Sequence, residues 1–222
     1  MSKSKDLSAF TPVAGFEGIY TAQKGNLRCT AVKLATGGVC LYSPVLGLGP
    51  VAMESLGKIG KVTHLLAPNH YHHKGLGEFH TAFPEAILCC SAAAKPRLEK
   101  QTSLSFTSLE EVPLPLAGGW DVLEPKGLKT GEIWMQSSTT DSTLWIVTDA
   151  FCGAKAPIGA VVEHPELLGT FPKFGVKDRA EYLAWLTQTL QNKAPTTIAP
   201  CHGALVSGAN VGADALELIS QI

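Results

Sequence analysis

The stretch LLAPNHYHHKGLGEF, residues 65–79, decides how the rest of the chain is interpreted. It holds three histidines within four positions, His70, His72 and His73, directly after the apolar run VTHLLAP (62–68). That run predicts a buried strand ending at Pro68. A histidine cluster after a strand is either a metal site or a polar loop bonded to backbone. If the segment is extended, His70 and His72 point to the same side and His73 points away, whereas a turn changes that pairing.

Length and composition limit the classes of protein to consider. The chain has 222 residues, 45% of them hydrophobic and 17% charged, which predicts one globular domain over residues 1–222. A formal net charge of -1 favours neither nucleic acid nor an anionic membrane as a partner. The start MSKSKDLSAF lacks the apolar segment of a signal peptide, and the six cysteines show no CxxC spacing. We therefore expect a cytoplasmic location with reduced thiols.

Apolar runs and helix signals alternate along the chain. Strands are predicted at 27–34, 37–44, 62–68, 86–91, 132–138, 142–150 and 196–200. Helices are predicted at 51–59, at 92–100 with a break at Pro96, at 178–192 with a capping-box start at Asp178 and Glu181, and at 212–222 with Leu216 and Ile219 on one face. Early hairpins mixed with crossovers predict an α/β layered domain with a mixed sheet or two sheets.

Three polar sites share one placement, just past the end of an apolar strand. The histidine cluster follows VTHLLAP, Asp149 follows TLWIVT, and His202 follows TTIAP and Cys201. Strand ends are where sites assemble from distant parts of a chain. Imidazole nitrogens and a carboxylate are suitable ligands for Zn²⁺ and related ions. On local grounds alone, each could instead be a capping or turn-forming residue.

This order of strands and polar residues resembles the metallo-β-lactamase fold superfamily. Its signature is HxHxDH, followed by a third His, a bridging Asp and a last His. The resemblance puts His70 and His72 on the first two positions, Asp149 on the bridging Asp and His202 on the last His. It implies a four-layer αββα sandwich with two mixed sheets, and a metal-dependent hydrolase.

A divergent branch of that superfamily, a domain of unknown function, is more similar still. The matching segments are LATGGVCLYSPV (34–45), LGKIGKVTHLLAPNHYHHKGLGEF (56–79) and FPEA (83–86). In that branch the paired histidines, here His72 and His73, are the steadier feature. The resemblance therefore leaves open whether His70 or His73 accompanies His72 as a ligand.

The chain also departs from the superfamily signature. Lys74 stands in place of the Asp of HxHxDH, Gly75 in place of the following His, and the third-His segment MQSSTTDST offers only Ser137 and Ser138. An ammonium group cannot ligate a metal and repels a second cation, so a two-metal site is not expected. We hypothesise that Lys74 takes the place of the second metal and pairs with Asp149, which would give both residues a catalytic role.

The sequence favours a hydrolase first and a non-catalytic member of the fold second, and it leaves open a third class, a redox or oxygen-chemistry protein that uses iron in the same pocket. The first is a hydrolase of an ester, thioester, amide or phosphoester that uses one zinc ion, or iron or manganese in its place. Its metal ligands would come from His70, His72, His73, Asp149 and His202. The second is a catalytically degenerate member of the fold, metal-free, that binds a small ligand or a protein. Lys74 favours the second function, and the retained histidines and Asp149 favour the first.

Overall fold

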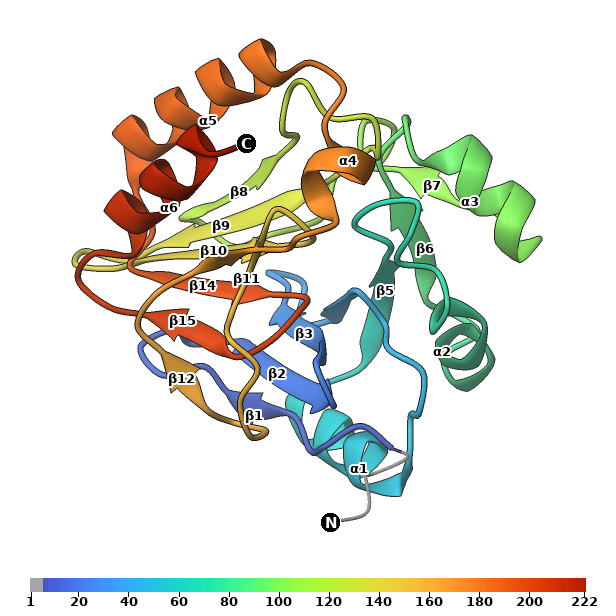
Figure 1. Ribbon diagram of the computed structural model, residues 1–222. Coiled ribbons are helices and arrows are strands. Elements are labelled where there is room, and N and C mark those ends of the chain that lie inside the picture. Colours follow the sequence, from blue (N-terminus) through green and yellow to red (C-terminus); the bar gives the residue numbers. More distant parts are fainter. Residues whose placement is uncertain (1–5) are drawn as a thin grey trace. The chain divides into compact units, whose positions relative to one another are not determined.

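The structure is a computed structural model that describes residues 6–222. The first five residues of MSKSKDLSAF lie outside the described residues, so the predicted lack of a signal peptide stays a prediction. The chain divides into two compact units, Met1–Gly118 and Gly119–Ile222. We describe each unit by itself (Figure 1).

The first unit is built on a seven-stranded mixed sheet, ordered β1-β2-β3-β4-β5-β6-β7. Strands β1 to β4 pair antiparallel, and β4 to β7 pair parallel. Parallel strands bring their carboxyl ends to one edge of the sheet, so the segments after β4 and β5 emerge side by side. The strands are β1 (Thr11–Pro12), β2 (Ile19–Lys24), β3 (Leu27–Lys33), β4 (Val39–Tyr42), β5 (Val62–Leu66), β6 (Ile87–Cys90) and β7 (Thr107–Ser108).

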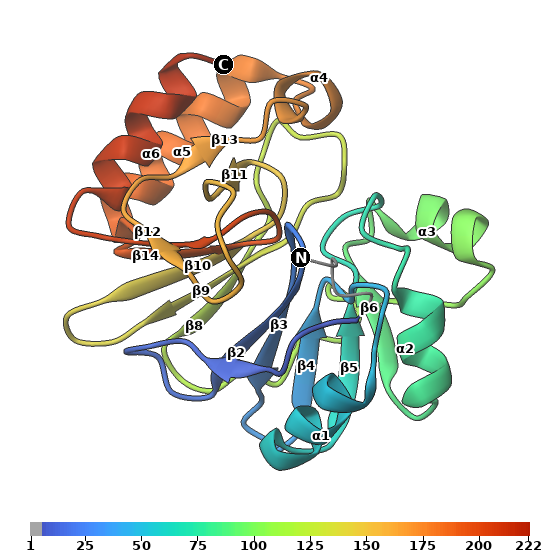
Figure 2. The ribbon, with the colours of Figure 1, turned by 60° about the horizontal axis from the view of Figure 1, so that its bottom comes forward.

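Three helices of this unit pack beside its sheet, and Figure 2 shows α2 and α3 beside β5 and β6. The helices are α1 (Pro50–Ile59), α2 (Leu76–Ala82) and α3 (Lys95–Thr102). Leu56, Phe79 and Leu98, one from each helix, join Leu41 and Leu65 of the strands in one buried cluster. Burying side chains of this size is the main force that holds a helix layer on a sheet.

The second unit has a six-stranded mixed sheet, ordered β12-β15-β14-β10-β9-β8. Its central strands β10 and β14 run parallel, with Val147 opposite Pro200, so both carboxyl ends reach the same edge. The sheet strands are β8 (Trp120–Leu123), β9 (Trp134–Ser138), β10 (Thr143–Val147), β12 (Val161–Val162), β14 (Thr197–Pro200) and β15 (Leu205–Ser207). A separate pair is formed by β11 (Phe151–Cys152) and β13 (Glu166–Leu167).

Helices α4 (Phe171–Gly175), α5 (Arg179–Lys193) and α6 (Val211–Ser220) complete the second unit. The helix α5 buries Tyr182, Leu186 and Leu190, one residue per turn, against a cluster that contains Trp134 and Trp145. The Asp178 carboxylate caps α5 by accepting a hydrogen bond from the Glu181 N–H, as the capping-box pattern predicts.

The predicted fold class, α/β with two mixed sheets, is confirmed, because each unit has one mixed sheet and its own helices. Two local predictions are wrong. Pro96 lies in the first turn of α3 instead of interrupting a helix, because a first-turn proline lacks only an N–H that needs no helical partner. Leu216 is 43% exposed and does not share the buried face of α6, which carries Val211, Ala215 and Ile219.

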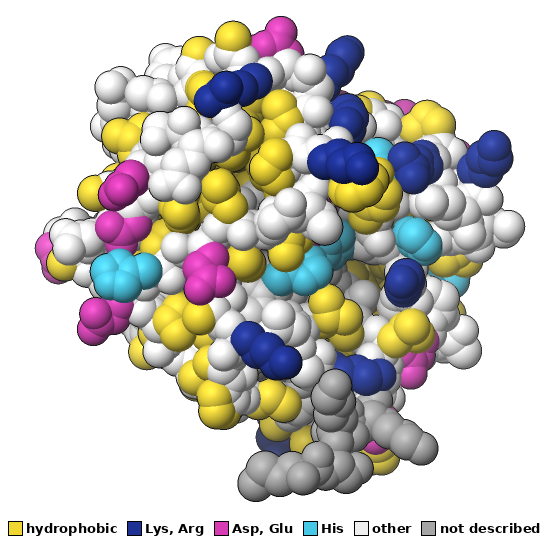
Figure 3. All heavy atoms as spheres, in the orientation of Figure 1, with side chains coloured by type: hydrophobic (Ala, Val, Ile, Leu, Met, Phe, Trp, Pro, Cys, Tyr) yellow, Lys and Arg dark blue, Asp and Glu magenta, His cyan; other side chains and the backbone are white. Residues whose placement is uncertain are grey.

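The surface agrees with the small net charge of the chain. Acidic and basic side chains both occur on the face drawn in Figure 3. Across residues 6–222, no helix combines the length and the apolar character that a membrane crossing requires.

Candidate metal centre

The histidine cluster of the first unit lies in a turn. The strand β5 ends at Leu66, and residues 70–75 form a series of turns that leads into α2. Asn69 organises this segment, because its Oδ1 accepts hydrogen bonds from the N–H groups of Tyr71 and His72, at 2.8 and 3.2 Å. This is an Asx turn, in which an asparagine side chain replaces a backbone partner. The extended geometry that would align His70 with His72 is therefore absent from residues 70–75.

The three histidines have different surroundings. His72 is half-buried, and its Nδ1 lies 2.8 Å from the Ser43 hydroxyl. His70 is only 6% exposed and its ring meets the Tyr71 ring edge-on at 4.3 Å. His73 is half-buried and its Nδ1 lies 3.2 Å from the His70 carbonyl oxygen, which binds it back onto its own turn. Lys74 is exposed, and its predicted pairing with Asp149 stays a prediction.

Ser43 comes from the segment after β4, the parallel neighbour of β5. It is 2% exposed and has a φ of 57°, which is uncommon for a residue other than glycine. Its N–H donates to the Leu66 carbonyl oxygen, so the pairing of β4 with β5 continues to the point where Ser43 meets His72. Metal-ligating histidines usually hold their second ring nitrogen in such a hydrogen bond.

Gly75 explains one departure from the HxHxDH signature. A Cβ at Gly75 would lie 2.2 Å from the Pro44 carbonyl oxygen, far inside van der Waals contact. The turn therefore packs directly on the segment after β4, and a histidine at this position would push the two apart. The glycine that replaces a ligand here is required by the packing of the loop.

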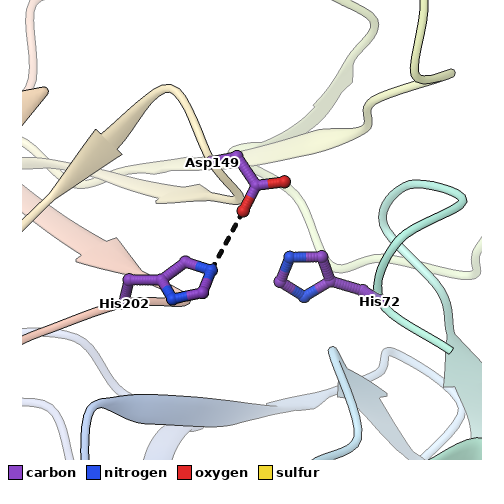
Figure 4. Close-up of side chains that lie close together, drawn as sticks. All are labelled: His72, Asp149 and His202. Atoms are coloured by element: carbon purple, nitrogen blue, oxygen red, sulfur yellow. Dashed lines mark hydrogen bonds and ion pairs between the residues drawn. The ribbon is translucent and has the colours of Figure 1, made fainter. Parts of the chain in front are cut away.

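The second unit places Asp149 and His202 together. Asp149 lies two residues beyond β10 and His202 two residues beyond β14. The Nε2 atom of His202 and Oδ1 of Asp149 are 3.0 Å apart (Figure 4). Both side chains are largely buried, with 22% of His202 and 15% of Asp149 exposed. The sequence predicted that these two strand ends would meet, and within this unit they do.

Main-chain contacts hold these two loops together. The Gly153 N–H donates to the His202 carbonyl oxygen at 3.0 Å, and the Cys201 N–H donates to that of Val147. Gly203 has a φ of 82°, and a Cβ there would meet the Gly153 carbonyl oxygen at 1.9 Å. The glycine after His202 is thus needed both for its backbone conformation and for the close approach of the two loops.

His72 belongs to the first unit, and Asp149 and His202 belong to the second. Two imidazoles and one carboxylate are a donor set of the kind that could hold a metal ion. Among the described residues, His70 and His73 belong to no such group of three. Ser137 and Ser138 are in β9, where they pair with Leu144 and Thr143 of β10. The ligand assignment from the sequence stays a prediction for all five of its residues.

Comparison with known proteins addresses the fold. No protein-family model matches the sequence, and no curated protein does either. Solved structures do match. The metallo-β-lactamase FIM-1 from Pseudomonas aeruginosa, in a mono-zinc form, is 10% identical with a TM-score of 0.64. The match covers 99% of this chain and 98% of FIM-1. A diflavin flavoprotein fragment from Nostoc sp. PCC 7120 is 12% identical with a TM-score of 0.65, at 97% coverage of both chains. The chain has the metallo-β-lactamase fold.

This metallo-β-lactamase fold occurs in proteins of different chemistry. The metal-soaked Flv1 flavodiiron core from Synechocystis sp. PCC6803 is 16% identical with a TM-score of 0.59. The match covers 98% of this chain, but this chain spans only 62% of that core. Similarity at these identities establishes the fold, and the activity has to be argued from the residues of the site.

Sequence reasoning missed the role of Ser43. In the metallo-β-lactamase fold of this chain, the Ser43 hydroxyl contacts the His72 ring. A signal was present in the sequence, since Ser43 follows an apolar strand just as Asn69 does. Two polar residues at the ends of adjacent parallel strands lie close together.

Proposed function

We propose that the chain is a metal-dependent hydrolase that holds one transition-metal ion with His72, Asp149 and His202. The proposal rests on the metallo-β-lactamase fold and on the chemistry of this donor set. Three protein ligands that leave a position for water are typical of catalytic zinc sites. The FIM-1 structure was solved with one zinc, so this fold accommodates a mononuclear site.

The observation that carries the proposal is the pairing of Asp149 with His202. Their Oδ1 and Nε2 atoms are 3.0 Å apart. Two ligand atoms that each lie about 2.1 Å from a tetrahedral zinc ion are about 3.4 Å from one another. The hydrogen-bonded pair therefore needs to open by only a few tenths of an ångström to hold one ion, and both side chains are largely withdrawn from solvent.

Ser43 supports His72 as the third ligand. Its hydroxyl engages Nδ1, which orients the ring and leaves ligation to Nε2. Asn69 fixes the backbone of the same residue through its bond to the His72 N–H. An imidazole with both its ring and its backbone held loses little freedom on binding an ion, which favours tight binding.

The substrate of this hydrolase would be a carbonyl or phosphoryl compound: an ester, thioester, amide or phosphoester. When bound, the ion lowers the pKa of a coordinated water to about 7 and polarises the substrate oxygen. Asp149 and His202 would orient the reacting groups and hold a proton between Oδ1 and Nε2 when no ion is present. Zinc is proposed first because it accepts both nitrogen and carboxylate ligands, and iron and manganese follow.

The direct test is the metal content of protein purified without chelators or metal-affinity resin, measured by elemental mass spectrometry. We expect about one equivalent per chain, lost in His202→Ala and in Asp149→Asn. The control His164→Ala changes an exposed histidine of the same unit and should keep the metal. Circular dichroism of each variant separates loss of ligand from loss of fold. Hydrolysis of ester and phosphodiester test substrates should fall with the metal.

A degenerate binding module is the second candidate, and Gly75 is the observation that favours it. The close approach to Pro44 removes one ligand position of the signature altogether. Protein that takes up no metal on reconstitution with Zn²⁺, Fe²⁺ or Mn²⁺ would refute the hydrolase and support this alternative. Two equivalents would show that Lys74 does not exclude a second ion.

A further inference from the structure

A cavity lies in the first unit, between α1 and the segment that follows α2. Its volume is about 290 Å³, at the small end of the range of ligand pockets, roughly 300–1,000 Å³. The walls are mainly apolar, with Met53 and Leu56 from α1, Val62 from β5, and Phe83 and Pro84 after α2. None of the proposed metal ligands lines it.

Gly57 borders this cavity. It lies inside α1, where a glycine is less favourable for the helix than an alanine. A Cβ at Gly57 would meet no atom within 4 Å, so packing within the fold does not require a glycine here. The position lines the cavity, and the missing side chain keeps that space open.

The charges at the cavity indicate what head group the ligand carries. Lys61 and Glu85 are the charged residues that line it, and both are exposed. Within residues 6–222 neither forms a salt bridge. One cation and one anion beside an apolar wall complement a molecule with an apolar body and both charges on its head.

We infer that this cavity binds a small zwitterion with an apolar body, of which free apolar amino acids are the simplest. The side chain would fill the space beside Gly57 and Phe83. The carboxylate would face Lys61 and the ammonium group would face Glu85. This site is separate from the proposed hydrolase and does not depend on it.

The experiment is a titration of the ¹⁵N-labelled full chain with L-phenylalanine and with L-leucine, followed by two-dimensional NMR. We expect saturable shifts of the Gly57 and Gly60 amide signals. Phenethylamine and 3-phenylpropionate each lack one charge and should bind about fivefold more weakly than phenylalanine. The absence of saturable shifts with both amino acids would overturn the inference.

Matched variants locate the ligand. Gly57→Phe fills the cavity and should abolish the shifts, whereas Gly77→Phe, at a glycine in α2 that also faces open space, should not. Lys61→Gln should weaken 3-phenylpropionate but not phenethylamine, and Glu85→Gln should do the reverse. If Gly57→Phe binds as well as the wild type does, the ligand occupies another place. If 2-phenylethanol, which carries neither charge, binds as tightly as phenylalanine, the role of the two charges is refuted. If Gly57→Phe does not fold, the two charge variants still decide.

Discussion

Ser43 keeps a backbone conformation that costs free energy while its hydroxyl holds His72. Its φ of 57° is in the left-handed region, where a residue other than glycine is strained by about 1–3 kcal/mol. The side chain is buried and meets Nδ1 of His72. Strain of this kind persists where surrounding contacts enforce it, and such positions are frequent at functional sites.

Substitutions at Ser43 should separate strain from ligand support. Ser43→Ala removes the hydroxyl and keeps the strain, and we expect metal affinity to fall about 10- to 100-fold. Ser43→Gly also removes the hydroxyl but relieves the backbone, so it should unfold at a higher urea concentration than Ser43→Ala. Metal titration and urea denaturation provide the two measurements. The control Ser207→Ala, which removes a hydroxyl bonded to Thr197, should keep the affinity. Equal metal affinity of Ser43→Ala and wild type would show that Ser43 does not support the ligand.

His164 should titrate above the usual range for a histidine. Its Nδ1 lies 2.8 Å from Asp214 Oδ2, and this hydrogen bond with the carboxylate raises the pKa of His164. A group whose pKa is raised by folding stabilises the fold below its unfolded pKa of about 6.5, and that contribution is lost as the pH rises through the folded value. Histidine NMR titration should show the shift, and Asp214→Asn should return it toward 6.5. A pKa that does not change in Asp214→Asn would disprove the pairing.

At the scale of elements, backbone contacts between the loops after β10 and β14 set the Asp149–His202 pair. Gly203→Ala should destabilise the fold strongly, because its Cβ would overlap the Gly153 carbonyl oxygen. Gly159→Ala is the matched control: its φ of 84° equals that of Gly203 within 2°, but its Cβ faces open space. The free energy of unfolding of the control should fall by about 1–2 kcal/mol from backbone strain alone. That of Gly203→Ala should fall by at least about 2 kcal/mol more.

Urea denaturation measures the stability of the Gly203→Ala and Gly159→Ala variants. Their metal content reports whether His202 has moved. Similar losses of stability in the two variants would mean that the loops separate easily and that the close approach is unimportant.

The longer elements could be predicted from the sequence because their pattern is local. The helix α5 follows from its cap and its apolar spacing, and β10 follows from a continuous apolar run. The two-residue strands β11, β12 and β13 could not be predicted, because pairing with distant partners defines them and their own composition does not. Leu216 shows the same limit, since an apolar residue on a helix can face solvent at little cost.

For the whole molecule, the state of the thiols is a simple check. All six cysteines are free and buried. Burial raises the pKa of Cys152 to about 11 and that of Cys90 to about 12, and burial with the neighbouring Cys40 thiol raises that of Cys29 further. Only the thiolate reacts, so the native protein should release far less than one equivalent from a disulfide reagent at pH 8, and the unfolded protein six. Rapid reaction of the native protein would show that a thiol is accessible.

Metal should also stabilise the whole chain, because an ion that binds only the folded state adds its binding free energy to folding. At a free concentration of 100 times the dissociation constant the gain is about 2.7 kcal/mol, which corresponds to roughly 5–10 °C in melting temperature for a chain of this size. Calorimetry with Zn²⁺ and with a chelator measures the difference. The same rise in His202→Ala would mean that the ion binds elsewhere.

The fold and part of the candidate site could be predicted because both follow from order along the chain. Polar residues after successive apolar strands indicated a sheet-edge site, and the Asp149–His202 pair is found at such an edge. The conformation of residues 70–75 could not be predicted, because the Asn69 turn and the Gly75–Pro44 contact depend on tertiary packing. The single domain over residues 1–222, the cytoplasmic location and the role of Lys74 stay predictions.

The bond from the Gly153 N–H to the His202 carbonyl oxygen is made by main-chain atoms that every amino acid except proline possesses. The loops that carry Asp149 and His202 therefore keep their mutual position without help from either side chain. Such a scaffold should tolerate exchange of the two proposed ligands. An Asp149→His chain would present two imidazoles on the same backbone, so selection or design can change which metal this fold prefers without rebuilding it.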